Sequence, residues 1–159
     1  MSVLIEIEEA IANPNLDAAL TQAAVEAVLR RYSERPAADL TVTLATNETV
    51  AQLNAQHRGE NKPTDVLSFA NDPDPDFPDL TGESDDYWGD IIIAYPVAQA
   101  QAETAGHQPS EEIILLAVHG ALHIVGFDHD TPERKAEMWT AQAQILADLG
   151  LPHIQPTES

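Results

Sequence analysis

The eleven residues HGALHIVGFDH, from His119 to His129, constrain the fold of this chain more than any other stretch. They follow the apolar run IILLAV, so the whole segment is predicted to be a helix that is apolar on nearly every side. A surface helix would need a polar face, and this one lacks it. We therefore expect a helix that is buried in the core and carries histidines.

Three of the six histidines lie in this stretch. Because His119 and His123 are four residues apart, a helix places them on one face, one turn from each other. Gly126 can adopt the left-handed conformation that ends a helix, and the chain reversal could bring His129 beside the first two. Three imidazoles would leave one position of a tetrahedral metal open, which is typical of a catalytic site. The pattern therefore predicts a metal centre.

The plainer alternative is that these histidines are buried and satisfied by backbone hydrogen bonds. Three polar rings in a core cost free energy unless something uses them, and this favours the metal. The chain has no cysteine, so thiolate ligands are excluded. One Zn²⁺ per chain suits three imidazoles, although nickel, cobalt or copper would also fit. Such a cation lowers the pKa of a coordinated water toward about 7 and polarises the bond to be cut.

The spacing also resembles the H-E-x-x-H-x-x-G-x-x-H pattern of zinc peptidases. Those enzymes need the glutamate after the first histidine as general base, and Gly120 stands there instead. Met138, which would have to lie in a tight turn beneath the metal, falls inside a predicted helix. A metzincin-like peptidase is therefore the weaker interpretation.

Composition limits the possible partners. The 159 residues suit a single domain (1–159), which we expect to be a metal-dependent, hydrolase-like one. The chain carries 27 acidic and 7 basic residues, a formal charge of −20, which disfavours charge-driven binding to a long nucleic acid. Much of the acid lies in a Pro-rich stretch, Asn71–Asp86, which is predicted to be a solvated loop. We expect no membrane span, no signal peptide and a cytoplasmic location.

Alternating and helical patterns predict an α+β fold: a small mixed four-stranded sheet packed with about five helices. The expected strands are Ser2–Glu8, Leu40–Ala45, Asp65–Ala70 and Trp88–Tyr95, the last ended by Pro96 and buried on both faces. The expected helices are Leu16–Tyr32, Glu48–Gln56 with Asn47 as N-cap, Val97–Ala105, Pro109–Val125, and one from Thr131–Pro132 to just before Gly150.

Three segments, HGALHIVGFDH, PTDVLSFA and WGDIIIAY, together resemble the bacterial YbeY family of ribosomal-RNA maturation endoribonucleases. The resemblance runs from about Leu53 to the end of the histidine helix. It implies that the three histidines bind a metal ion, usually assigned as zinc. It also implies cleavage of single-stranded RNA, maturation of the 16S rRNA 3′ end and a part in ribosome quality control, with ribosomal RNA and the ribosome or its proteins as partners.

The resemblance further implies that Arg58, just before the Thr-Asp-Val-Leu-Ser-Phe strand, handles RNA. We therefore expect Arg58 and His119 to be catalytic, and Arg58 and Lys62 to bind phosphate; plain solvated loop charges are the alternative. Asp128 could orient a ligand histidine from behind, or serve only as a turn acid. The chain departs from the family at His57, Ala70 and Phe127, where an aromatic residue, proline and tyrosine are common.

Several other side chains have weaker predictions. Arg30, Arg31 and Arg35 could extend an RNA path, although a solvated helix end is the stronger interpretation. His107 and His153 are expected at the surface, and Tyr87 and Trp88 could stack on a base or belong to the core.

A function without catalysis also stays open: a metal-stabilised ribosome assembly factor that binds RNA or protein and cuts nothing. An acidic surface would suit docking onto basic ribosomal proteins. Against a nuclease, the pattern contains no evident general acid or base. In its favour, metal-activated water or the RNA's own 2′-hydroxyl could attack the phosphodiester without one.

Overall fold

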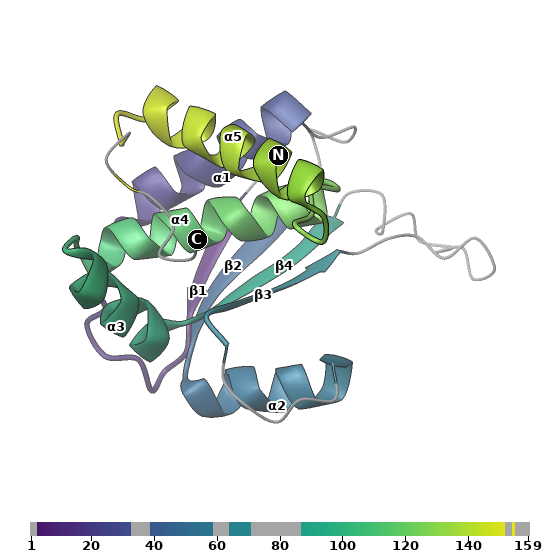
Figure 1. The fold of residues 1–159 in the computed structure, drawn as a ribbon. Coiled ribbons are helices and arrows are strands. Elements are labelled where there is room, and N and C mark those ends of the chain that lie inside the picture. Colours follow the sequence, from purple (N-terminus) through teal and green to yellow (C-terminus); the bar gives the residue numbers. More distant parts are fainter. Residues whose placement is uncertain (1–2, 33–38, 59–63, 71–86, 152–153, 155–159) are drawn as a thin grey trace.

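A mixed four-stranded sheet forms the centre of the computed structural model, which describes residues 3–32, 39–58, 64–70, 87–151 and 154 (Figure 1). The strand order is β1-β2-β4-β3. The first three of these are mutually parallel, and β3 runs antiparallel to β4 at one edge. The strands are β1 (Val3–Ile7), β2 (Asp39–Ala45), β3 (Val66–Ala70) and β4 (Tyr87–Ala94).

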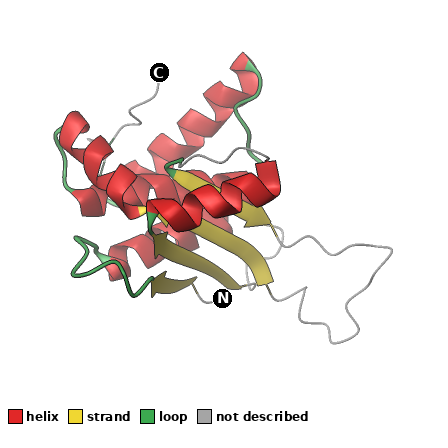
Figure 2. Ribbon diagram, turned by 90° about the horizontal axis from the view of Figure 1, so that it is seen from below, coloured by secondary structure: helices red, strands yellow, loops and turns green. Residues whose placement is uncertain are grey.

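Five helices in the described ranges cover the two faces of this sheet unequally. Figure 1 shows α2 alone below the sheet, while α1, α4 and α5 lie above it, and Figure 2 gives the same layers from below. The predicted α+β fold, with a small mixed sheet and five helices, is therefore confirmed. The helices are α1 (Ala18–Tyr32), α2 (Asn47–Arg58), α3 (Tyr95–Ala105), α4 (Pro109–Ile124) and α5 (Pro132–Asp148).

The histidine helix, α4, is the most buried of the described helices, as its apolar sequence predicts. It packs against α1, α3, α5 and the strands β3 and β4, and most of its residues are buried. Gly120 allows the closest approach to the sheet: a Cβ atom there would lie 2.9 Å from Cγ2 of Ile91. The glycine therefore has a packing role, because any side chain at this position would push α4 away from β4.

Side-chain alternation divides the core into two parts. Ile91 and Ile93 of β4 belong to the large cluster under α1 and α4. Ile92 and Leu67 belong to the smaller cluster against α2. Burial of β4 on both faces, which its continuous apolar centre predicts, is thus confirmed.

Several predicted boundaries differ from the observed ones by one or two residues, and two of these differences have a clear physical reason. Asn47 is the first residue of α2 rather than its cap, since the Thr46 hydroxyl accepts a hydrogen bond from the Thr49 backbone N–H at 3.2 Å. Helix α3 begins at Tyr95, before the predicted Val97. Pro96 does follow β4, but it lies in the first turn of this helix, where a missing N–H costs nothing.

The connection from α4 to α5 is short and well defined. Gly126 has a φ of 114°, and the Phe127 backbone N–H reaches back to the Leu122 carbonyl at 2.9 Å. Thr131 then caps α5 by accepting a hydrogen bond from the Arg134 backbone N–H at 3.1 Å. The chain reversal predicted at Gly126 is confirmed, and it carries His129 back toward α4.

None of the helices in the described ranges is long and apolar enough to cross a bilayer. The predictions for the acidic loop 71–86, Arg35, Lys62 and His153 lie outside the described residues.

Candidate metal centre

Three histidine rings converge beside α4. His119 and His123 come from its last two turns, and His129 comes from the connection to α5. One ligand nitrogen from each ring lies within 4.8 Å of the other two. The Nε2 atoms of His119 and His123 are 3.2 Å apart. The predicted meeting of these three side chains is therefore observed.

This arrangement fits a tetrahedral metal ion. Zinc–nitrogen bonds of about 2.0–2.1 Å at tetrahedral angles place two ligand nitrogens roughly 3.3 Å apart. The 3.2 Å between the two Nε2 atoms is close to that value. The three donors are all imidazole nitrogens, a set that suits zinc and its late first-row neighbours.

Burial keeps the two helical imidazoles neutral. Desolvation lowers the pKa of His119, partly opposed by the hydrogen bond with Gln142. It lowers the pKa of His123 to about 4, with His119 and His129 adding positive charge nearby and a hydrogen bond to the Phe127 backbone opposing the shift. A neutral ring offers the lone pair that a metal requires. At neutral pH both rings are therefore ready to bind a cation.

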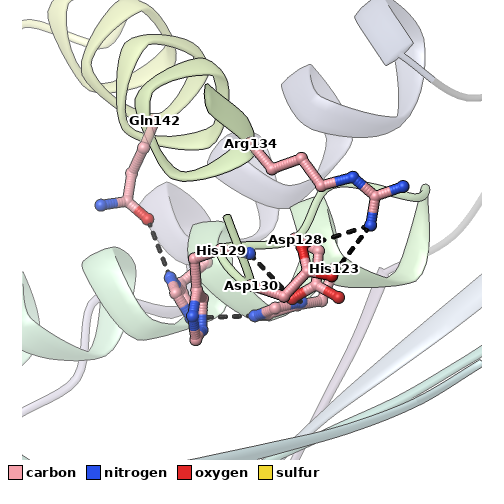
Figure 3. Close-up of polar contacts among 7 residues, drawn as sticks. His123, Asp128, His129, Asp130, Arg134 and Gln142 are labelled. Atoms are coloured by element: carbon pink, nitrogen blue, oxygen red, sulfur yellow. Dashed lines mark hydrogen bonds and ion pairs between the residues drawn. The ribbon is translucent and has the colours of Figure 1, made fainter. Parts of the chain in front are cut away.

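Gln142 orients His119. Its Oε1 atom accepts a hydrogen bond from His119 Nδ1 at 3.2 Å, reaching down from α5 as Figure 3 shows. This contact places the proton on Nδ1 and leaves Nε2 free toward the other histidines. Gln142 is 2% exposed, although glutamine is rarely buried. Sequence reasoning missed it; the available signal was one polar residue within the apolar stripe of α5.

Asp128 is a turn residue that also lies near the rings. Its Oδ1 atom accepts the His129 backbone N–H at 2.8 Å and is 4.0 Å from His123 Nδ1. The first contact is the main reason why the pKa of this carboxyl is lowered. Asp130 next to it pairs with Arg134 at 3.2 Å. The hydrogen bond to the His129 backbone is what a turn acid makes, while 4.0 Å is too long for a hydrogen bond to His123, so a role of Asp128 in orienting that ring stays a prediction (Figure 3).

The histidines form one end of a cavity of about 200 Å³ between α4, β3 and α5. One face of α4 supplies most of its wall, with side chains spaced three or four residues apart. The edge strand β3 supplies its opposite wall. The lining residues are Thr64, Asp65, Val66, Ser68, Glu112, Leu115, Leu116, His119, Gly120, His123, His129, Trp139 and Gln142.

An aromatic side chain borders the three rings. Trp139 of α5 meets His119 and His129 edge-to-face, with ring centroids 5.7 and 5.8 Å apart. The ammonium of Lys135 lies 5.3 Å from the Trp139 ring centroid, within cation–π range. Trp139 and Lys135 lie one helical turn apart on α5, and the packing of α5 brings the indole against His119 and His129.

A buried hydrogen-bonded pair involves Glu112, another residue of the cavity lining. His107 Nε2 is 2.7 Å from Glu112 Oε1, and their side chains are 9% and 1% exposed. The prediction that His107 lies at the surface is therefore wrong, because the turn between α3 and α4 folds its ring against Glu112. Glu112 lies in the first turn of α4, where acids are common, and the sequence pattern does not indicate its burial.

The predicted basic residues are only partly described. Arg58 is the last residue of α2, and its side chain, like those of His57, Tyr87 and Trp88, lies outside what the structure describes. Arg30 and Arg31 pair with Glu26 and Asp148 at 3.3 and 3.1 Å. These contacts agree with a solvated end of α1.

The geometry also bears on the peptidase alternative. The residue after the first histidine is Gly120, whose missing side chain is the condition for contact with Ile91. Met138 is buried within α5 rather than in a turn beneath the rings. The chain therefore has neither the general-base glutamate after the first histidine nor a turn at Met138 beneath the rings.

Comparison with known proteins identifies relatives over most of the chain. The family described as Endoribonuclease YbeY matches residues 5–150. Endoribonuclease YbeY of Brevibacillus brevis is 42% identical over 120 residues, 71% of this chain and 76% of that protein. The corresponding protein of Chloroflexus aurantiacus is 35% identical over 152 residues, 95% of this chain and 97% of its own.

A solved structure supports the same fold. The solution structure of TM1509 from Thermotoga maritima superimposes with a TM-score of 0.56 and covers 99% of each chain. At 18% identity, this likeness concerns the fold alone.

Proposed function

Since this chain belongs to the YbeY family of endoribonucleases, we propose that it is a metal-dependent endoribonuclease that acts on single-stranded RNA. Its place of action would be the cytoplasm, in maturation of the 16S rRNA 3′ end and in ribosome quality control. The observation that carries the proposal is the convergence of three histidine nitrogens at one end of a cavity.

One zinc ion per chain would be held by His119, His123 and His129. When bound, it supplies an activated water and positive charge for the phosphate. The chain's own residues prepare this site. Burial keeps the His119 and His123 imidazoles neutral, and Gln142 holds the His119 ring in the orientation a metal needs.

Arg58 and Lys62 would bind the phosphate of the RNA. Arg58 ends α2, and the segment that follows leads to Thr64 and Asp65 at the cavity. A guanidinium there can hold two phosphate oxygens at once, which both positions the RNA and stabilises developing charge. Two cations beside a largely acidic chain would confine RNA binding to this one region.

The alternative, an assembly factor that cuts nothing, finds less support than the nuclease. The relatives that match this chain carry the name endoribonuclease. Ribosomal partners remain part of the proposal in either case.

The test compares cleavage of a single-stranded RNA containing the 16S rRNA 3′ region by wild type, His119→Ala and Arg58→Glu. Zinc content is measured for each purified protein. We expect cleavage by wild type and its loss in both variants, with the metal lost only from His119→Ala. Arg30→Glu, a change of the same charge on α1, serves as the matched control and should cut normally.

Two outcomes would overturn the proposal. Wild type that binds one metal yet leaves the RNA intact would support the assembly factor. Cutting that survives His119→Ala would separate the activity from the three histidines.

A further inference from the structure

One carboxyl group in the cavity has hydrogen-bonding capacity that the proposed cleavage site does not use. Glu112 is 1% exposed, and its Oε1 atom is occupied by His107. Its Oε2 atom has no hydrogen-bond partner among the described residues. A buried carboxylate oxygen without a partner is costly, so this atom calls for a donor from outside the chain.

Glu112 lies too far from the histidines to act on the reacting phosphate. It precedes His119 by two turns of α4, a rise of roughly 10 Å at 1.5 Å per residue. Both residues nevertheless line the same cavity. The glutamate therefore lies in the part of the cavity wall farther from the histidines along α4, which we call the inner end and define by Glu112, Leu115 and Asp65, although the charge of Asp65 acts on both Glu112 and His119.

Asp65 provides a second carboxyl in this cavity. It lies just before β3, where its Oδ1 atom accepts the Val66 backbone N–H at 2.8 Å. Among the described residues, its Oδ2 atom accepts a long hydrogen bond from Gln101 Nε2, at 3.4 Å. Asp65 also acts on Glu112 through space, since its negative charge adds to the burial that raises the Glu112 pKa. Two carboxyl groups, one from α4 and one from the residue before β3, thus line the same cavity.

Apolar side chains complete the walls between these carboxyls and the metal centre. Leu115 and Leu116 come from α4, and Val66 comes from β3. The cavity of about 200 Å³ exceeds the roughly 30 Å³ occupied by one water molecule several times over. A cavity lined by both apolar side chains and carboxyl acceptors suits a flat ring that carries donors on one edge.

We propose that the inner end binds a guanine base of the RNA substrate, with its N1–H and N2–H₂ edge directed at Glu112 and Asp65. Guanine presents two adjacent donors on its Watson–Crick edge, whereas the other bases place an acceptor beside each donor. The rise of roughly 10 Å along α4 from Glu112 to His119 suits a base next to the phosphate that is cut. This inference rests on the proposed function and adds a base preference to it.

The first test measures binding without any cleavage. Zinc-loaded protein is titrated calorimetrically with GMP and with IMP, which differ only by the 2-amino group of the base. We expect GMP to bind about tenfold more tightly, the effect of one hydrogen bond to a buried charged acceptor. AMP, CMP and UMP should bind no more tightly than IMP.

Substitutions test whether Glu112 and Asp65 cause the preference for GMP over IMP. Glu112→Gln keeps the shape of the side chain and a partner for His107, but it can turn an amide donor toward the ligand. We expect it to lose the preference for GMP while keeping its zinc and its melting temperature. Asp65→Asn should weaken the preference in the same direction. Glu103→Gln, the same change at an exposed position of α3, should keep the preference in full.

Equal binding of GMP and IMP by wild type would overturn the inference, as would a preference that survives Glu112→Gln. The second test separates this failure from failure of the proposed function. Single-stranded RNAs carrying one guanosine or one inosine in an otherwise uridine sequence are offered to wild type. Cleavage at equal rates overturns the guanine subsite and leaves the nuclease in place. Selective GMP binding without cleavage of any RNA overturns the nuclease and leaves the subsite.

Discussion

At the scale of single residues, the site depends on groups that hold the ligands as much as on the ligands themselves. His119 is fixed by one buried amide, Gln142, at 3.2 Å. Outer partners of this kind are worth roughly 10–100-fold in metal affinity. The proposed metal site therefore depends on the orientation of the His119 ring as well as on the presence of its nitrogen.

Replacing Gln142 tests this directly. We expect Gln142→Ala to weaken zinc binding by about 10–100-fold, because His119 loses the acceptor that fixes its tautomer. Gln142→Glu keeps an acceptor oxygen and should bind more tightly than the alanine variant. Affinity is measured by competition with a chelator. Gln144→Ala, at an exposed position of the same helix, is the matched control, and equal affinities for the two alanine variants would contradict the assignment.

The lowered pKa of His123 predicts how stability depends on pH in the metal-free protein. The folded-state pKa is about 4 and the ordinary value is 6.5, so the unfolded chain binds a proton first as the pH falls. The stability that comes from keeping His123 neutral is fully present above pH 6.5 and is lost as the pH falls to about 4. A shift of this size corresponds to about 3 kcal/mol, for a side chain that is 25% exposed.

Urea unfolding of the metal-free protein at several pH values checks this. We expect the free energy of unfolding to fall by a few kcal/mol between pH 7 and pH 4, and less steeply in His123→Gln. Parallel curves for the two proteins would show that His123 does not carry the dependence.

At the scale of helices and strands, the short connection from α4 to α5 controls the site. Gly126 has a φ of 114°, and a Cβ atom there would meet nothing within 4 Å. The cost of a side chain is therefore conformational strain rather than a clash. Because His129 follows three residues later, that strain acts on a proposed metal ligand.

We expect Gly126→Ala to lower the free energy of unfolding by about 1–3 kcal/mol and to weaken zinc binding. Gly150→Ala is the matched control, since Gly150 also has a positive φ of 80° with open space around it but follows the far end of α5. It should lose stability and keep its zinc affinity. Thermal melts and chelator competition measure the two quantities, and equal loss of affinity in both variants would contradict this account.

Local sequence patterns predicted the helices and strands well because each pattern depends only on residues that are near one another in the sequence. Apolar periodicity gave α4 and the strands, and the spacing of three histidines around Gly126 gave the centre of the site. The failures concern choices between neighbours: Thr46 caps α2 in place of Asn47, and Pro96 lies inside α3. Thr46 and Asn47 are both suitable N-cap residues, and Pro96 suits either the end of a strand or the first turn of a helix. Tertiary packing decides between these possibilities.

The rest of the site could not be predicted, because it depends on contacts between distant segments. Gln142 and Trp139 reach the histidines only because α5 packs against α4. Glu112 and Asp65 share a cavity only because β3 lies at the edge of the sheet beside α4. No periodicity within one segment contains this information.

At the scale of the whole molecule, the charge of −20 opposes the binding of a polyanion. RNA binding must then depend on a few local cations and on the cavity. If Arg58 and Lys62 neutralise two phosphates, the logarithm of the affinity for single-stranded RNA should fall with the logarithm of salt with a slope of about −1.4. Arg58→Glu should flatten the slope. Filter binding with metal-free protein measures it, and a slope several times steeper would indicate a larger basic surface.

The central claim is that three histidines hold one metal ion on which RNA cleavage depends. The most direct measurement is cleavage of single-stranded RNA by metal-free protein as Zn²⁺ is added in known amounts. We predict no cleavage without metal, a linear rise to one equivalent and a plateau beyond it, with no such rise in His129→Ala. Full cleavage before any metal is added, or one equivalent of bound zinc without cleavage, would contradict the account.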